Sequence, residues 1–249
     1  QRAAIGDVEV FLGISLVDTF RSEHFDHIRL ISYGAVGTNA KFVRTGEMDV
    51  LPCHFSALPN LIGSGQFPID VVFAQISPPG PNGTHSLGFC NDYLPIAMSR
   101  ARVVIAEINT NVPWVYQDVP FDEELVTLAI ESDEPVAPYE PVRPGALETQ
   151  IARHIASRIE DGATIQYGIG GIPPAVLKAL EGHRDLGLHS GLVSDEAVDL
   201  IQAGVITNAR KPIHRGKSVG AVAFGGDKFK NFVHANPNFE MHQSTSTHG

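Results

Sequence analysis

The sequence has little of several features that mark particular classes of protein. It contains only two cysteines, Cys53 and Cys90, among 249 residues, which predicts reduced thiols rather than a disulfide framework. No apolar run reaches the roughly 18 residues of a membrane-spanning helix and no signal peptide is visible, so we expect a cytoplasmic protein without a membrane partner. Basic residues are also few, because 18 lysines and arginines stand against 28 acids and leave a formal net charge of −10. Without a basic stripe, a nucleic-acid partner is not expected.

Apolar residues, in contrast, are plentiful and fall in short runs. Hydrophobic residues make up 43% of the chain, enough for one large or two small domains. Four early runs predict strands: 8–15, 28–35, 69–76 and 102–108. The last two are nearly all apolar, which is typical of central parallel strands covered by helices on both faces.

A loop rich in proline and glycine, 77-SPPGPNG-83, follows the third of these runs. In open α/β sheets, ligands bind just beyond the carboxyl ends of strands, so this loop is a candidate wall of a binding site. An ordinary surface turn is the alternative interpretation.

A second irregular segment, 131–145, is rich in proline and acidic residues. This composition is typical of a linker and predicts a domain boundary near residue 140. We therefore expect one α/β domain over residues 1–140 and a second over residues 141–249.

The second half alternates helix and strand signals. In 148–162, Ile151, Ile155 and Ile159 recur every four residues, which predicts an amphipathic helix that Gly162 ends. Ser194 is a candidate N-cap for a later helix. The remaining segments predict strands at 163–168, 186–190 and 218–224 and a helix at 175–180. This alternation indicates right-handed crossovers and a parallel sheet.

The loop 168-GIGGIP-173 joins a predicted strand to a predicted helix. Its free amides and the N-terminus of the helix suit an anion or a developing oxyanion. A dinucleotide-binding fingerprint would need a third glycine where Pro173 stands, and an acid about 20 residues later, where 190-SGL-192 has none. A nicotinamide site is therefore disfavoured.

Five segments, in their order and spacing, give the chain a family resemblance. They are 38–62, 69-IDVVFAQISPPGPNGTHSLGFCNDY-93, 102–118, 158-RIEDGATIQYGIGGIPPAVLKAL-180 and 186–211. In these segments the chain resembles the acetyl-CoA hydrolase/transferase family, which includes acetate and 4-hydroxybutyrate CoA-transferases. The resemblance implies two similar open, largely parallel α/β domains with the active site between them. It also implies that family chains run well past residue 249, so that the second domain is incomplete here.

The resemblance implies a covalent reaction. A glutamate attacks an acyl-CoA thioester, the coenzyme A thiolate then attacks the glutamyl carbonyl, and a second carboxylate takes the coenzyme from the enzyme. The substrates would be an acyl-CoA and small carboxylates, with no permanently bound cofactor. We expect a homo-oligomer, with a dimer as the default.

The resemblance also maps binding residues onto the chain. The oxyanion amides fall at Ile169, Gly170 and Gly171, in the glycine loop. Contacts with substrate and coenzyme A fall on and near the loop after residue 76: Ser77, Pro78, Gly83, Ser86, Asp92 and Tyr93. Simpler interpretations stay open, since the glycines can serve close helix–strand packing and the Asp–Tyr pair can brace a loop.

The chain departs from the family at the catalytic glutamate. The family pattern reads His, Ser or Thr, Glu and an apolar residue, whereas 189-HSGL-192 has Gly191 at the glutamate position. One explanation is another nucleophile, Glu196 or Glu107, although Glu196 also suits the first turn of a helix. A second is thioester hydrolysis with a general base, for which His189 is the nearest candidate, or acyl-CoA binding without catalysis. A third is a variant subfamily with different chemistry.

The eleven histidines raise the question of a metal. No pair of them shows the i, i+4 spacing on a predicted helix, with a nearby acid, that a metalloenzyme motif would have. We therefore expect no metal site.

Overall fold

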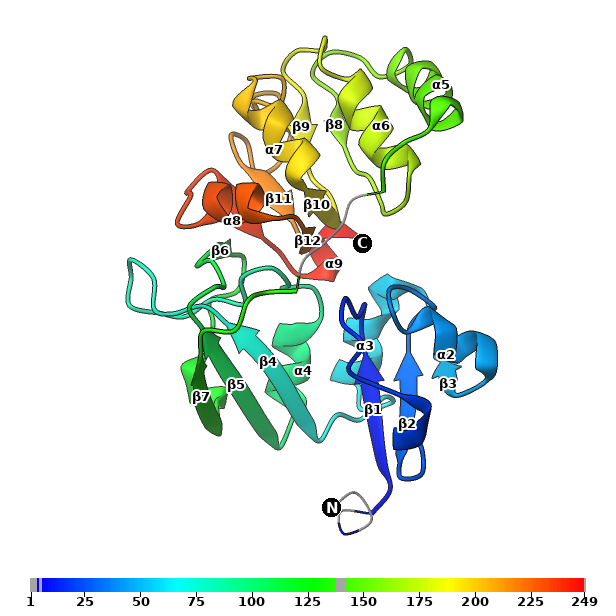
Figure 1. Cartoon of the computed structure of the whole chain (residues 1–249). Helices are drawn as coiled ribbons and strands as arrows, with labels where there is room; N and C mark the ends of the chain where they lie inside the picture. The colour runs from blue at the N-terminus through cyan, green and yellow to red at the C-terminus, as the bar shows by residue number, and fades with distance from the viewer. Residues whose placement is uncertain (1–3, 5, 138–141, 249) are drawn as a thin grey trace. The chain divides into compact units, whose positions relative to one another are not determined.

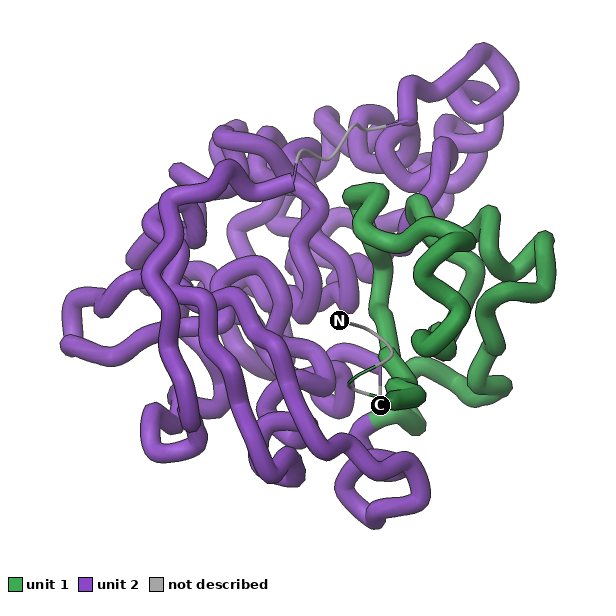
Figure 2. Tube along the Cα trace, turned by 60° about the horizontal axis from the view of Figure 1, so that its bottom comes forward, with its two compact units in different colours: residues 1–58 green, residues 59–249 purple. Residues whose placement is uncertain are grey.

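The computed structural model describes residues 4, 6–137 and 142–248. The chain divides into two compact units, residues 1–58 and residues 59–249, which Figure 2 distinguishes by colour. The domain boundary predicted near residue 140 lies outside the described residues. The division into domains 1–140 and 141–249 therefore stays a prediction.

The first unit is built on a three-stranded parallel sheet in the order β1-β2-β3. Its elements are β1 (Val8–Leu12), η1 (Ser22–His24), β2 (Ile28–Ser32), α2 (Ala40–Thr45), β3 (Met48–Val50) and η2 (Phe55–Ala57). A small core forms between the sheet and α2 from Leu30, Phe42 and Met48. The register pairs Glu9 with Arg29, and Arg29 binds both Glu9 and Asp49, on the two flanking strands.

The second unit begins with a parallel sheet in the order β4-β5-β7. The elements here are α3 (Leu58–Gly63), β4 (Val71–Ile76), α4 (Leu94–Arg100), β5 (Val103–Asn109), η3 (Glu123–Leu125) and β7 (Leu128–Ser132). Burial alternates along β4: Val72, Ala74 and Ile76 pack with α4, whereas Phe73 is 76% exposed. The expectation that this strand is covered on both faces is therefore wrong.

The rest of the second unit packs around one larger apolar core. Figure 1 shows helices α5 to α8 of this part. Its elements are β6 (Tyr116–Gln117), α5 (Ala146–Ala156), β8 (Thr164–Ile165), α6 (Ile172–Ala179), β9 (Gly187–Leu188), β10 (Leu192–Ser194), α7 (Asp195–Gln202), β11 (Ser218–Gly220), β12 (Val222–Phe224), α8 (Asp227–Val233), β13 (Phe239–Met241) and α9 (Ser244–Thr247). The strands form three small sheets, β8-β9, β10-β12 and β11-β13-β6, with parallel pairings throughout. An α/β fold with largely parallel sheets is thus confirmed.

Two predicted boundaries are wrong for identifiable reasons. The helix predicted to reach Gly162 is α5, which ends at Ala156. Beyond it, the amides of Arg158 and Ile159 bond to carbonyls only three residues back, so tight turns replace the helix. The strand predicted over 218–224 is two strands in different sheets, because the carbonyl of Ala221 between them accepts a hydrogen bond from the amide of Asn91 at 2.9 Å.

The two cysteines are free thiols, as predicted. Cys90 donates to Asp92 Oδ2, with 3.4 Å between sulfur and oxygen. In the described part of the chain, no helix combines the length and the apolarity needed to cross a membrane.

The core of the second unit generates a stability prediction. Phe229 is 1% exposed and its ring lies 5.6 Å from that of Phe239, so Phe229→Ala leaves a cavity among buried neighbours. We expect a loss of about 3–5 kcal/mol in the free energy of unfolding. Urea denaturation followed by the fluorescence of Trp114, which is buried in the same unit, measures this loss.

The matched control is Phe73→Ala, which removes the same side chain from an exposed position on β4. It should change the free energy of unfolding by no more than about 0.5 kcal/mol. Equal effects of the two substitutions would contradict the assignment of Phe229 to the core.

Candidate functional site

The predicted glycine loop lies between β8 and α6. Gly168 and Gly170 are exposed, and a Cβ atom added at either would meet nothing within 4 Å. Gly170 has a φ of +119°, a conformation that strongly favours glycine. Proline in the first turn then starts α6, since its fixed φ suits a helix N-terminus. The loop therefore presents open backbone at the start of a helix.

A small cleft, with a volume of about 10 Å³, lies against this loop. Its lining joins the loop to β10 and to the start of α7: Tyr167, Gly168, Ile169, Gly170, Pro173, Pro174, Leu192, Ser194 and Glu196. The structure thus brings together three predicted site residues, Ile169, Gly170 and Glu196. Gly171 is the N-cap of α6 and does not line the cleft. The space beside it is bounded by Val142 and Glu148.

Tyr167 ties the glycine loop to the neighbouring strand end. Its hydroxyl accepts a hydrogen bond from the amide of Ser194 at 2.9 Å and lies 3.3 Å from Ser194 Oγ. Its backbone amide donates to Ser190 Oγ, and that hydroxyl donates back to the carbonyl of Tyr167, each at 3.1 Å. Burial raises the pKa of Tyr167, so the phenol keeps its proton at neutral pH. Ser194 is the N-cap residue of α7, as predicted, but its side chain makes no capping bond.

Gly191 is buried and lies against the imidazole of His248. A Cβ atom at residue 191 would stand 1.9 Å from His248 Cε1 and 2.3 Å from its Nε2. Any side chain at residue 191, including the glutamate of the family pattern, therefore requires His248 to move. Burial lowers the pKa of His248, so its ring is neutral near pH 7. The position of the His248 ring therefore depends on the absence of a side chain at residue 191.

His189, the predicted general base, does not line the cleft. Its Nε2 lies 3.0 Å from the carbonyl oxygen of Ser246. Its ring centroid lies 5.8 Å from that of His214 and 6.5 Å from that of His242. Burial lowers the pKa of His189, and nearby cationic groups lower it further. This histidine therefore belongs to a cluster of imidazoles rather than to the glycine loop.

The loop after β4 is braced from within. Ser77 and Ser86 are both buried, with their hydroxyl oxygens 3.3 Å apart. Ser77 Oγ accepts from the amide of Ser86 at 3.0 Å and donates to the carbonyl of Pro78 at 2.8 Å. Gly83 has a φ of +79° in an exposed turn closed by its bond to Gly80. These contacts favour a structural role for the two serines, whereas Gly83 stays accessible at the tip.

Asp92 and Tyr93 lie where this region meets the C-terminal strands. The carbonyl of Asp92 accepts from the amide of Ser244 at 3.0 Å. One carboxylate oxygen of Asp92 accepts from the amide of Tyr93 and the other from Cys90. Burial raises the pKa of Asp92 to about 6 despite these bonds. A carboxylate perturbed in this way is a functional candidate, although structural networks produce the same effect.

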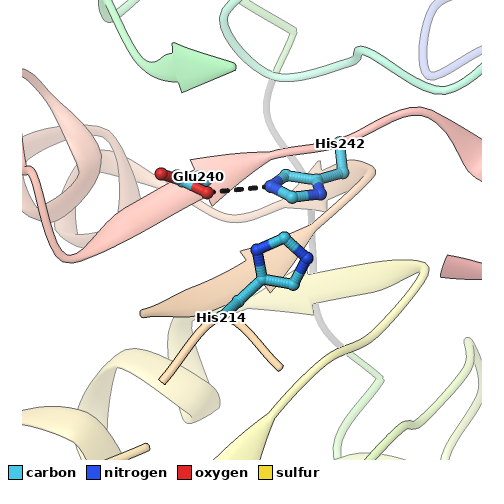
Figure 3. Close-up of side chains that lie close together, drawn as sticks. All are labelled: His214, Glu240 and His242. Carbon is cyan, nitrogen blue, oxygen red and sulfur yellow. Dashed lines mark hydrogen bonds and ion pairs between the residues drawn. The ribbon is translucent and has the colours of Figure 1, made fainter. Parts of the chain in front are cut away.

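Sequence reasoning missed a cluster of three side chains: His214, Glu240 and His242 (Figure 3). Glu240 and His242 are two residues apart at the end of β13, so they share one face of the strand. The only sequence signal was this spacing, E-x-H, because His214 arrives from a distant loop. The expectation that the chain has no metal site stays untested.

Beside the cluster lies a buried lysine. Lys211 is 2% exposed, and its Nζ donates to the carbonyls of Leu188 at 2.8 Å and Lys217 at 2.7 Å. Burial lowers its pKa to about 8. A Cβ atom at Gly187 would lie 2.5 Å from Lys211 Cγ, so the glycine makes room for the lysine stem.

Comparisons with known proteins identify the family. The acetyl-CoA hydrolase/transferase N-terminal domain matches residues 4–139. The chain belongs to the acetyl-CoA hydrolase/transferase family. It is 38% identical over 219 residues to the 4-hydroxybutyrate coenzyme A transferase of Clostridium kluyveri, covering 88% of this chain and 50% of that relative. It is 33% identical over 227 residues to the succinyl-CoA:cyclohexane-1-carboxylate CoA transferase of Geobacter metallireducens, covering 90% and 51%.

Solved structures agree with this membership in the acetyl-CoA hydrolase/transferase family. RipA from Yersinia pestis superposes with a TM-score of 0.88 at 28% identity, covering 98% of this chain and 59% of that one. The 4-hydroxybutyrate CoA-transferase of Porphyromonas gingivalis gives a TM-score of 0.78 at 32% identity, covering 98% and 66%. The chain spans about half the length of the curated relatives it matches.

The raised pKa of Asp92 generates a prediction about pH. Its folded-state pKa of about 6 lies above the value of about 3.9 expected in the unfolded chain. Between these values the folded state binds more protons, so this group makes folding less favourable as pH rises from 4 to 6. Asp92→Asn removes the effect. Relative to the parent, the variant should therefore gain about 3 kcal/mol in free energy of unfolding across this range.

Urea denaturation of parent and variant at several pH values between 4 and 7 measures this gain. Asp133→Asn, at an exposed position, is the matched control. Its free energy of unfolding should change with pH as that of the parent does. Parallel curves for Asp92→Asn would show that the Asp92 carboxyl titrates normally.

Proposed function

We propose that the protein transfers coenzyme A between short-chain acyl-CoA and carboxylates of the acetyl-CoA or 4-hydroxybutyryl-CoA type. The observation that carries this proposal is the 38% identity to a 4-hydroxybutyrate coenzyme A transferase across most of the chain. On this view an acyl-CoA is a substrate and not a resident cofactor. A cytoplasmic location and a homodimer stay predictions.

The geometry of the glycine loop supports acyl transfer. Attack on a thioester carbonyl places negative charge on oxygen, and backbone amides that are already fixed in position stabilise that charge. Ile169 and Gly170 line the cleft, with no Cβ atom at Gly170 to keep a carbonyl away. We assign the oxyanion site to this loop, with Gly171 as the cap of the adjoining helix.

Glu196 is the nucleophile that the cleft favours in place of a glutamate at residue 191. It lines the same cleft as Gly170, whereas Glu107 does not. Glu107 instead lies on β5, with one oxygen 3.3 Å from Gln75 Nε2. In the proposed reaction the Glu196 carboxylate attacks the thioester carbon and expels coenzyme A thiolate, leaving a mixed anhydride. The thiolate then attacks the glutamyl carbon and releases the acyl carboxylate, so that Glu196 carries coenzyme A as a thioester.

A second function, thioester hydrolysis, has His248 as its candidate base because of its contact with residue 191, although His248, like His189, does not line the cleft. The ring occupies the space of a side chain at residue 191, and its lowered pKa leaves a neutral imidazole that can accept a proton. In hydrolysis, His248 would take a proton from the attacking water and return it to the leaving thiolate. His189 is less suitable because its Nε2 lies on the Ser246 carbonyl.

Trapping with borohydride tests the transferase. Treating the intact protein with acetyl-CoA and then borohydride reduces a glutamyl-coenzyme A thioester to an alcohol, and peptide mass spectrometry locates the mass loss. We expect the label on the peptide that holds Glu196. Glu196→Gln should abolish it, and Glu107→Gln, the matched control, should not.

Absence of any label would overturn covalent transfer and leave two outcomes. Turnover of acetyl-CoA without an acceptor carboxylate would establish hydrolysis. In that case His248→Ala should slow turnover by about 10²- to 10⁴-fold. Saturable binding of coenzyme A without turnover would establish a non-catalytic acyl-CoA-binding protein.

The crowding between residue 191 and His248 gives a further prediction. Gly191→Glu alone must displace the imidazole, whereas Gly191→Glu combined with His248→Ala has space for the new side chain. We expect the double variant to show borohydride label at residue 191 and the single variant to show less. Equal labelling of the two would mean that His248 moves aside without cost.

A further inference from the structure

The cluster of His214, Glu240 and His242 joins two segments of the second unit. Glu240 and His242 come from β13 and the residue after it, and His214 comes from the loop before β11 (Figure 3). β11 and β13 are paired in parallel, so the loop leads directly into the strand that neighbours β13. His214 has a φ of +50°, a backbone conformation that most residues avoid but that His, Asn and Asp adopt more often.

The three side chains present ligand atoms to one point. One atom from each lies within 4.8 Å of the others. His242 Nε2 lies 2.9 Å from Glu240 Oε2, and the two imidazole centroids are 4.7 Å apart with their planes at 87°. From this geometry we infer that His214, Glu240 and His242 form a binding site for a zinc ion.

Two imidazole nitrogens and one carboxylate oxygen are a ligand set that zinc takes in proteins, with a fourth position open to water. Donor–zinc distances are about 2.0–2.2 Å, so His214 must move toward the other two ligands, and the Glu240–His242 contact must open to admit the ion. His214 can supply that movement because it is exposed on a loop. Magnesium and calcium fit less well, since they prefer oxygen ligands.

Neighbouring groups already orient two of the ligands. Ser246 Oγ lies 3.3 Å from His242 Nδ1, and Asp118 Oδ2 lies 3.9 Å from the same nitrogen. Partners of this kind hold a proton on Nδ1 and leave Nε2 for the metal. Glu240 binds Lys217 through Oε1, and its Oε2 is paired with His242 Nε2, a contact that a bound zinc ion would replace.

The lysines beside the cluster oppose a cation and provide a discriminating variant. Lys217 competes directly for Glu240, and Lys211 adds a second positive charge nearby. Removing the Lys217 ammonium should therefore strengthen zinc binding, whereas removing a ligand should weaken it. A cluster with a purely structural role would not respond in opposite directions.

The test is isothermal titration of the intact chain with zinc chloride at pH 7.5. We expect one zinc ion per chain at this site. His214→Asn suits the left-handed backbone and removes the imidazole, and it should weaken binding by more than 100-fold. Ser246→Ala should weaken it by about 10- to 100-fold, and Lys217→Met should strengthen it.

His154→Ala is the matched control, because His154 is an exposed histidine on α5. Its zinc affinity should equal that of the parent, and circular dichroism should show that every variant is folded. Zinc binding that is absent in the parent, or unchanged in His214→Asn and Glu240→Gln, would overturn the proposal.

Discussion

The second unit depends on the side chain of one buried asparagine. Asn91 is fully buried, and its backbone amide donates to the carbonyl of Ala221 at 2.9 Å. Its side-chain amide donates to Asp118 Oδ1 at 2.8 Å and to the carbonyl of Met241 at 2.9 Å, while its Oδ1 accepts from Gln117 at 2.9 Å. Only a carboxamide offers two donors and an acceptor together at this length. Any other side chain would leave buried partners unsatisfied, at about 1–3 kcal/mol each.

This network explains why several candidate functional residues lie near it. The Asn91 bonds hold β6 beside β13, and they fix Asp118, whose other oxygen accepts from the amide of Gln243 at 3.0 Å. Met241 lies between Glu240 and His242 in the sequence. The bond from Asn91 to the Met241 carbonyl therefore also positions these two members of the cluster. The buried carboxyl of Asp92 follows directly in the chain. Its pKa is raised because the carboxyl is buried.

Local patterns made part of this fold predictable. The glycine loop was located because it lies between a short strand and a proline-started helix, and those signals are contained within a dozen residues. The end of α5 was missed because Ile159 continues the apolar repeat, although the backbone turns after Ala156. The split at Ala221 was missed because it depends on Asn91, 130 residues earlier in the sequence numbering. A hydrogen bond over that separation leaves no periodicity to detect.

In the candidate site, too, some features could be predicted from the sequence and others could not. Ile169 and Gly170 could be predicted from the family resemblance of the glycine loop, and Glu196 from its place five residues after Gly191. The contact between Gly191 and His248 could not be predicted, because it depends on how closely two residues pack that no sequence motif connects. The cluster around His214 was hidden for a further reason: its third member arrives through a loop that carries no regular structure.

The strand end at residues 189–191 links these separate features. Successive side chains of an extended chain point to opposite sides, and the contacts here follow that rule. Ser190 bonds to Tyr167 and so supports the glycine loop, whereas His189 and Gly191 both meet the segment around α9, through Ser246 and His248. A side chain at residue 191 therefore meets His248 first. For this reason the loss of the family glutamate is compatible with an intact glycine loop, and the two can be altered independently.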